Sequence, residues 1–208
     1  MKQNSSKLFW NNSIHEATTN HSDIDCIVKM SHVSQSAANQ VSNLAVQRSH
    51  EGLKYRINEE FFDNWSEPMA YVLGYIYADG CIDKNKGSFE ITSKDSDHLI
   101  KIRDCMEGNM KLGYRTNKLG SWYRLRVNRK YVTDRLRQIG LTPNKSLTMI
   151  YPDIPEQYSN HFIRGYFDGD GCVYIYKNRP NAMQIDFACG SELFITKLYN
   201  ILTSQIGD

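Results

Sequence analysis

The chain is predicted to fold as an α+β protein made of two pseudo-symmetric units, and three observations lead to this prediction. Two segments, Ala70–Gly80 and His161–Gly171, have similar sequences, and the aspartates near their ends, Asp79 and Asp170, are 91 positions apart. Both segments are apolar enough for buried helices, whereas the segments after them alternate apolar and polar residues as strands do. With 208 residues and 40% hydrophobic content, the chain can form one or two ordinary cores. A repeat of this length predicts two units that each supply one carboxylate.

The ends of the two helices are marked in the sequence. Ser66 precedes the first helix as a predicted N-cap, and Pro68 falls in the first turn, where proline is tolerated. Gly80 and Gly171 follow the last turn of each helix, so we expect both helices to end through a left-handed glycine.

Small residues lie four positions apart in both helices: Gly74 and Ala78 in the first, Gly165 and Gly169 in the second. Positions four apart share one helix face, so each helix offers a smooth stripe to another backbone. If the stripes meet, the C-terminal ends come together and Asp79 lies beside Asp170.

Two carboxylates at the C-terminal ends of helices repel each other and face the negative ends of both helix dipoles. A divalent cation resolves both problems, and oxygen ligands with room for water suit Mg²⁺. The alternative is that each Asp-Gly pair is a turn that closes a buried helix. The two copies in register favour the shared metal site.

The rest of the first unit is predicted as a strand pair, a helix, a second strand pair and a closing helix. The predicted elements are the strand Ser88–Thr92, the helix Asp95–Glu107, the hairpin strands Lys111–Asn117 and Trp122–Asn128, and the helix Lys130–Ile139, which ends at Gly140. This αββαββα order predicts a four-stranded antiparallel sheet with helices on one side.

The second unit begins in the same way, with strands Cys172–Tyr176 and Met183–Phe187 and a helix from Ser191 to Gln205. A second hairpin and closing helix have no counterpart, so we expect this unit to be incomplete. We place the first unit at residues 59–160 and the second at 161–208.

Residues 1–58 form a separate N-terminal region. Its first part is polar, and two short helical patterns at 23–30 and 34–48 are compatible either with a helix-turn-helix module or with a plain helical hairpin on the main domain.

Positive charge is concentrated between residues 101 and 150, where 12 Lys or Arg face 3 Asp or Glu, although the whole chain carries only +2. This excess suits a polyanion such as nucleic acid, and the alternative is a solvated basic face. The open face of the predicted sheets would present polar side chains to a DNA groove, where Arg reads guanine and Asn reads adenine. The residues expected to contact DNA are Lys111, Arg115, Arg124, Arg126, Asn128, Lys145 and Gln184.

The segments Val72–Gly80 and Ile163–Gly171 resemble the two signature helices of LAGLIDADG homing endonucleases. The first departs from the family pattern at Tyr77, where the family often has an aspartate. The run Leu141–Met149, followed by Asp153–Pro155, is similar to the run that precedes the second helix in many members. The resemblance covers roughly residues 59–208.

The resemblance implies a site-specific, Mg²⁺-dependent endonuclease that cleaves both strands of DNA as a monomer. Asp79 and Asp170 would be catalytic and would bind metal, with help from the carbonyl groups of Ala78 and Gly169. Lys94, after the second strand, resembles the family's active-site lysine, and the corresponding place in the second unit has none. Lys145 is a second candidate for this role. The alternative interpretation is that Lys145 is simply an exposed residue of a surface loop.

A different class of function uses the same scaffold without cleavage: an RNA maturase that assists intron splicing, or a DNA-binding regulator. If the second unit is naturally short, a partner chain could complete it. Five cysteines without Cys-x-x-Cys spacing argue against a disulfide framework or zinc site. The sequence has no signal-like start and no stretch of about 18 apolar residues. We therefore expect an intracellular protein with access to DNA, in the cytoplasm or an organelle, and no membrane contact.

Overall fold

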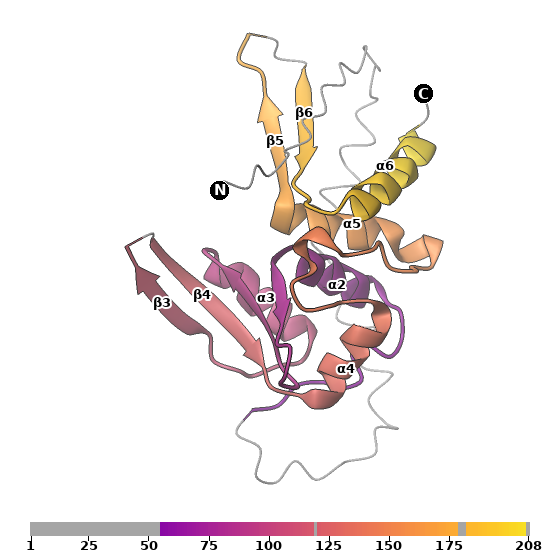
Figure 1. Ribbon diagram of the computed structural model, residues 1–208. Coiled ribbons are helices and arrows are strands. Elements are labelled where there is room, and N and C mark those ends of the chain that lie inside the picture. Colours follow the sequence, from indigo (N-terminus) through magenta and orange to yellow (C-terminus); the bar gives the residue numbers. More distant parts are fainter. Residues whose placement is uncertain (1–54, 119, 179–181, 207–208) are drawn as a thin grey trace, which may run out of the picture. The chain divides into compact units, whose positions relative to one another are not determined.

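A computed structural model describes residues 55–118, 120–178 and 182–206, which all belong to one compact unit (Figure 1). The predicted N-terminal helices at 23–30 and 34–48 lie outside the described residues. Across the described ranges, no helix is both long enough and apolar enough to cross a membrane.

Helix α2 spans Glu67–Asp79 and begins as the sequence predicts. The Ser66 hydroxyl accepts a hydrogen bond from the Met69 amide at 3.3 Å, and a proline lies in the first turn. Most of the helix is buried, which explains why its sequence is apolar on nearly every face.

The prediction that both signature helices end through a left-handed glycine is wrong. Gly80 has φ −82° and ψ 148°, and Gly171 has φ −94° and ψ 159°, both extended. The chain runs directly from each helix into a strand, so it needs no left-handed reversal. Glycine is required for space: a Cβ on Gly80 would lie 2.4 Å from the Ile76 carbonyl oxygen, and one on Gly171 would lie 2.0 Å from the Phe167 ring.

The first unit contains the predicted four-stranded antiparallel sheet. Its strands, in the spatial order β1-β2-β4-β3, are β1 Gly80–Ile82, β2 Phe89–Ser93, β4 Gly120–Val127 and β3 Gly113–Asn117. Phe89 pairs with Val127 and Ile91 with Leu125, and all four side chains are buried on one face.

Helices α3 (Ser96–Cys105) and α4 (Lys130–Ile139) complete the first unit. Helix α3 is shorter than predicted at both ends: Asp95 is its N-cap, with a side chain that accepts from the His98 amide at 2.9 Å, and Glu107 has a positive φ of 52°. Helix α4 has the predicted bounds and ends at Gly140, which is left-handed with φ 118°.

The second unit repeats the order helix, strand, strand, helix. Helix α5 spans Glu156–Asp170, β5 spans Gly171–Ile175, β6 spans Met183–Phe187 and α6 spans Glu192–Ile206. Strands β5 and β6 form a two-stranded antiparallel sheet. The described part of this unit therefore matches the first four elements of the first unit.

Helices α2 and α5 lie against each other, and their glycines set how closely they approach (Figure 1). A Cβ placed on Gly74 would lie 2.0 Å from the Phe162 carbonyl oxygen, and one on Gly165 would lie 2.0 Å from the Tyr71 carbonyl oxygen. Neither position accepts a side chain without moving the other helix. The two helices are therefore in backbone contact.

Candidate active site and nucleic-acid interface

The C-terminal ends of α2 and α5 bring Asp79 and Asp170 to one place. A Cβ on Gly169 would lie 2.4 Å from the Ala78 Cβ and 3.5 Å from Asp79 Oδ2, so the last turns of the two helices touch. Burial raises the pKa of Asp79. Burial and then the Asp79 charge raise the pKa of Asp170 to about 6. The two carboxylates therefore interact electrostatically, as the shared-site prediction requires.

Lys145 lies close enough to both acids to interact with their charges and is only 7% exposed. Its Nζ donates a hydrogen bond to the Ala78 carbonyl oxygen at 2.8 Å. Burial lowers the pKa of Lys145, and the negative charges of Asp170 and Asp79 act in the opposite direction. Lys145 is therefore not an exposed lysine of a surface loop.

The backbone around Lys145 explains how a loop holds a buried lysine. Asn144 adopts left-handed geometry with φ 57°, and a short 3₁₀ helix, η2, spans Lys145–Leu147. The Lys145 carbonyl oxygen accepts from the amides of Thr148 and Met149 at 3.0 and 2.8 Å. This turn lets the Lys145 side chain reach the last turn of α2 at Ala78.

Lys94, the first choice for a basic residue at the site, is exposed between β2 and α3. Lys145 lowers the pKa of Asp79, and Lys94 is not among the groups that do so. Within the described residues, Lys145 is thus the lysine that contacts the end of α2 and interacts with both aspartates.

The protein groups around Asp79 and Asp170 supply some of the oxygen ligands that a hard cation needs. No cluster of three or more His, Cys, Asp or Glu side chains occurs in the described ranges, so the two aspartates are the carboxylate ligands available. Lys145 occupies one lone pair of the Ala78 carbonyl oxygen and leaves a second one. Two carboxylates and main-chain oxygens, with water completing the coordination, form a donor set that fits Mg²⁺.

A second set of polar residues covers the open face of the four-stranded sheet. Arg124 lies 3.4 Å from Glu90, and Arg126 lies 3.7 Å from the same Glu90 oxygen. Arg126 also donates to Asn128 Oδ1 at 3.1 Å. Arg115 of β3 lies opposite Trp122 of β4, on the same face of the sheet as Arg124. The Glu90 carboxylate thus holds the two guanidinium groups side by side.

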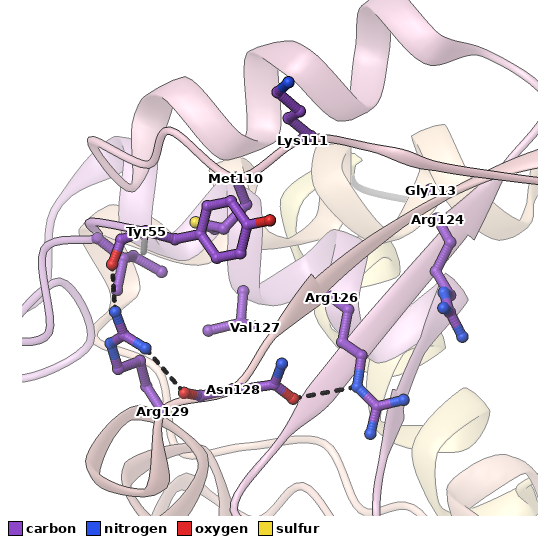
Figure 2. A pocket seen from close by; sticks show the side chains of 10 residues that line it. Tyr55, Met110, Lys111, Gly113, Arg124, Arg126, Val127, Asn128 and Arg129 are labelled. Atoms are coloured by element: carbon purple, nitrogen blue, oxygen red, sulfur yellow. Dashed lines mark hydrogen bonds between the residues drawn. The ribbon is translucent and has the colours of Figure 1, made fainter. Parts of the chain in front are cut away.

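The open face continues into a hollow of about 220 Å³. Figure 2 shows its lining, in which Arg124 and Arg126 extend from β4 and Lys111 and Asn128 lie beyond the strand ends. Arg129 closes one edge through a hydrogen bond to the Tyr55 carbonyl oxygen and an ion pair with Glu59 at 3.3 Å.

Gln184, the predicted contact on the second sheet, lies on β6 opposite Tyr174. Its amide donates to Asp186 Oδ1 at 2.8 Å and accepts a hydrogen bond from the Tyr176 hydroxyl. Neighbouring side chains thus already fix the orientation of this amide.

The count of basic residues overstates the charge that is free to meet DNA. Five of the twelve form ion pairs with acids outside the open face: Arg103 with Asp104, Arg129 with Glu59, Arg135 with Asp63, and Lys130 and Arg137 with Asp134. The sequence shows how many basic residues there are but not which of them form ion pairs within the protein. It therefore could not distinguish basic residues that stabilise the fold from those on the open face of the sheet.

Two acid-tipped helices in backbone contact, each followed by an antiparallel sheet, define an α+β protein of the homing-endonuclease-like class. The family model of the LAGLIDADG-like domain matches residues 66–140 and 157–207, more than half of the chain. The chain belongs to the LAGLIDADG-like domain family.

Two known proteins are similar to parts of the chain. A DNA polymerase of Acanthamoeba polyphaga mimivirus is 31% identical over 124 residues, which cover 53% of this chain and 7% of the polymerase. The chain thus matches only a small part of that polymerase. The solved structure of the homing endonuclease I-WcaI, bound to its DNA recognition sequence, matches with a TM-score of 0.50 and 15% identity, over 71% of this chain and 72% of that one. This likeness supports the fold.

Proposed function

We propose that the protein is a site-specific endonuclease that cleaves both strands of DNA with the help of a divalent metal, Mg²⁺. The convergence of Asp79 and Asp170 around the buried Lys145 carries this proposal. A buried pair of like charges is costly unless cations compensate it. A single lysine neutralises one of the two negative charges, and a divalent cation would more than offset the other, which suits a site that also receives a phosphate.

Asp79 and Asp170 would hold the metal, together with the carbonyl oxygens of Ala78 and Gly169. When bound there, Mg²⁺ supplies Lewis-acid stabilisation of the phosphate and lowers the pKa of a coordinated water. Lys145 contributes a fixed positive charge beside the reacting phosphate, where a preorganised charge stabilises the charge that develops. Because one chain carries both acids, a monomer would suffice.

The open face of the first sheet would bind double-stranded DNA. Arg124 and Arg126 would read base edges or contact phosphates, with Arg115 further along the same face. Support comes from the shared fold with I-WcaI, whose structure contains its DNA recognition sequence.

The test is cleavage of a supercoiled plasmid library that carries candidate long sites, with Mg²⁺ or with EDTA. We expect nicked or linear plasmid only with Mg²⁺, and loss of cutting in Asp79→Asn and Asp170→Asn. Asp153→Asn is the matched control because Asp153 is exposed and precedes α5. Cutting that persists in both single variants, or no cutting by the wild-type chain on any site, would contradict the proposal.

A second candidate function is nucleic-acid binding without cleavage, which would use the same open face of the first sheet, where Arg124 and Arg126 flank Glu90. An RNA maturase or DNA-binding regulator would bind DNA or intron RNA through the first sheet. Such a protein would retain full binding in Asp79→Asn and Asp170→Asn, measured by gel shift, and would show no metal-dependent cutting.

A further inference from the structure

A chain of polar contacts joins three helices on one side of the helix pair. The Tyr71 hydroxyl, on α2, donates to Asp168 Oδ2 on α5 at 2.5 Å. The same hydroxyl lies 3.4 Å from Nε2 of His98 on α3. The guanidinium of Arg164 lies 4.5 Å above the Tyr71 ring. These contacts fix α2 laterally against both neighbours.

This series of contacts continues to the candidate active site through Tyr75. Its ring lies 4.5 Å from the His98 ring, and its side chain is only 3% exposed. Tyr75 precedes Asp79 by one helical turn, so both side chains share a helix face. Burial raises the pKa of Asp79, and the neighbouring Tyr75 hydroxyl acts in the opposite direction. A buried tyrosine in contact with His98 therefore lies one turn before Asp79, on the same helix face.

The corresponding positions on the other side of the helix pair are aromatic. The 91-residue repeat matches Tyr71 with Phe162 and Asp168 with Tyr77. His98 corresponds to Phe194, because each lies three residues after its helix-capping side chain, Asp95 or Ser191.

This aromatic cluster has no polar chain. Tyr77 packs on Phe162 at 5.3 Å and on Phe194 at 6.1 Å. Its buried hydroxyl has no hydrogen-bond partner in the part of the chain that the structure describes.

The two tyrosines one turn before the acids also differ. Tyr166, which corresponds to Tyr75, donates its hydroxyl to the Ala188 carbonyl oxygen at 3.0 Å. The Tyr166 hydroxyl is therefore used by the main chain, whereas the Tyr75 hydroxyl influences the pKa of Asp79. The two acids are therefore held in different ways.

We propose that Tyr71, His98 and Tyr75 are positioning residues that orient Asp79 for metal binding, and that Asp170 has no such support. This inference rests on the proposed metal-dependent function. It predicts two inequivalent half-sites, in which the ordered Asp79 contributes more than Asp170 to the affinity for the metal.

The test measures Mn²⁺ binding to the full-length protein, from the electron paramagnetic resonance signal of free Mn²⁺, in the absence of DNA. Tyr75→Phe removes one hydroxyl and should weaken Mn²⁺ binding roughly three- to tenfold, the effect of one lost hydrogen bond. Tyr166→Phe is the matched control and should leave Mn²⁺ affinity unchanged. Tyr71→Phe removes the contacts of the Tyr71 hydroxyl with His98 and Asp168. This variant should also weaken Mn²⁺ binding, by a smaller factor than Tyr75→Phe.

Equal Mn²⁺ affinity of the wild type, Tyr75→Phe and Tyr166→Phe would overturn the inference and leave the proposed function standing. A wild-type protein that fails to bind Mn²⁺ would instead count against the metal-dependent function itself. Circular dichroism of each variant shows whether it is folded. A second readout is the ratio of nicks in the two DNA strands once a cleaved site is known, which Tyr75→Phe should change and Tyr166→Phe should not.

Discussion

Replacing Gly165 with alanine tests the backbone contact on which the site depends. The added Cβ would lie 2.0 Å from the Tyr71 carbonyl oxygen, 2.9 Å from the Tyr71 carbonyl carbon and 3.0 Å from the Tyr75 amide nitrogen. All three are main-chain atoms of α2, so no side-chain rotation relieves the clash. Ordinary contact begins at 3.4 Å, so the helices must separate by the difference, about 1.4 Å, at this point.

Two opposing effects set the size of the change. Alanine is a better helix former than glycine by about 1 kcal/mol, which favours the variant. Overpacking a rigid contact costs about 1–3 kcal/mol and sometimes more, and a shift against main-chain atoms belongs at the upper end. We expect a net loss of about 2 kcal/mol in the free energy of unfolding.

The measurement is urea denaturation followed by circular dichroism, with Gly113→Ala as the control. A Cβ on Gly113 would have its nearest neighbours at 3.7 Å, an ordinary contact, so this variant should be as stable as the wild type. Gly74→Ala, whose Cβ would lie 2.0 Å from the Phe162 carbonyl oxygen, should match Gly165→Ala. Wild-type or higher stability in Gly165→Ala would refute the close helix contact.

Three further predictions concern charge. The pKa of Asp170 is raised to about 6 from an ordinary 3.8, so the metal-free protein should lose stability as pH rises from about 4 to about 6, and Asp170→Asn should remove this loss in urea titrations with EDTA. Lys145→Met should raise the pKa of both Asp79 and Asp170 further, so that Mn²⁺ binding begins at a higher pH than in the wild type. The same variant should reduce the rate of single-turnover cleavage by about 10²- to 10³-fold. Arg126→Ala should weaken DNA binding and reduce the slope of log K against log salt by about one, measured by fluorescence anisotropy, whereas Lys130→Ala, at an exposed ion pair on α4, should have a smaller effect.

Each of these would be contradicted by a specific result. A flat stability profile in the wild type between the two pH values would show that Asp170 is not electrostatically strained. Full cleavage in Lys145→Met would remove that lysine from the site. Equal effects of Arg126→Ala and Lys130→Ala would mean that binding responds to total charge and not to the sheet face.

Much of the fold could be predicted from the sequence because its signals are local or periodic. The alternation of Phe89 and Ile91 with polar residues places one face of β2 in the core, and Ser66 with Pro68 defines the start of α2. The small residues at helical spacing indicated where α2 and α5 touch.

Other features depend on contacts between distant parts of the chain, and the sequence did not show them. Lys145 belongs to a loop whose direction depends on the left-handed Asn144, so its burial was not apparent. Tyr75 could have been noticed one turn before Asp79, but its partners Ser93 and His98 come from other elements. Glycine permits both left-handed and extended geometry, and only the following strand decided which one Gly80 adopts.

The division of labour between glycines and aspartates has an evolutionary consequence. Gly74 and Gly165 hold the two helices together, whereas Asp79 and Asp170 lie at the tips and carry a burial penalty. Loss of either acid would therefore leave the architecture intact and relieve part of that penalty. If the protein is the endonuclease proposed above, a descendant could lose cleavage through one or two substitutions and keep its fold, whereas substitution of the glycines would disturb the helix contact.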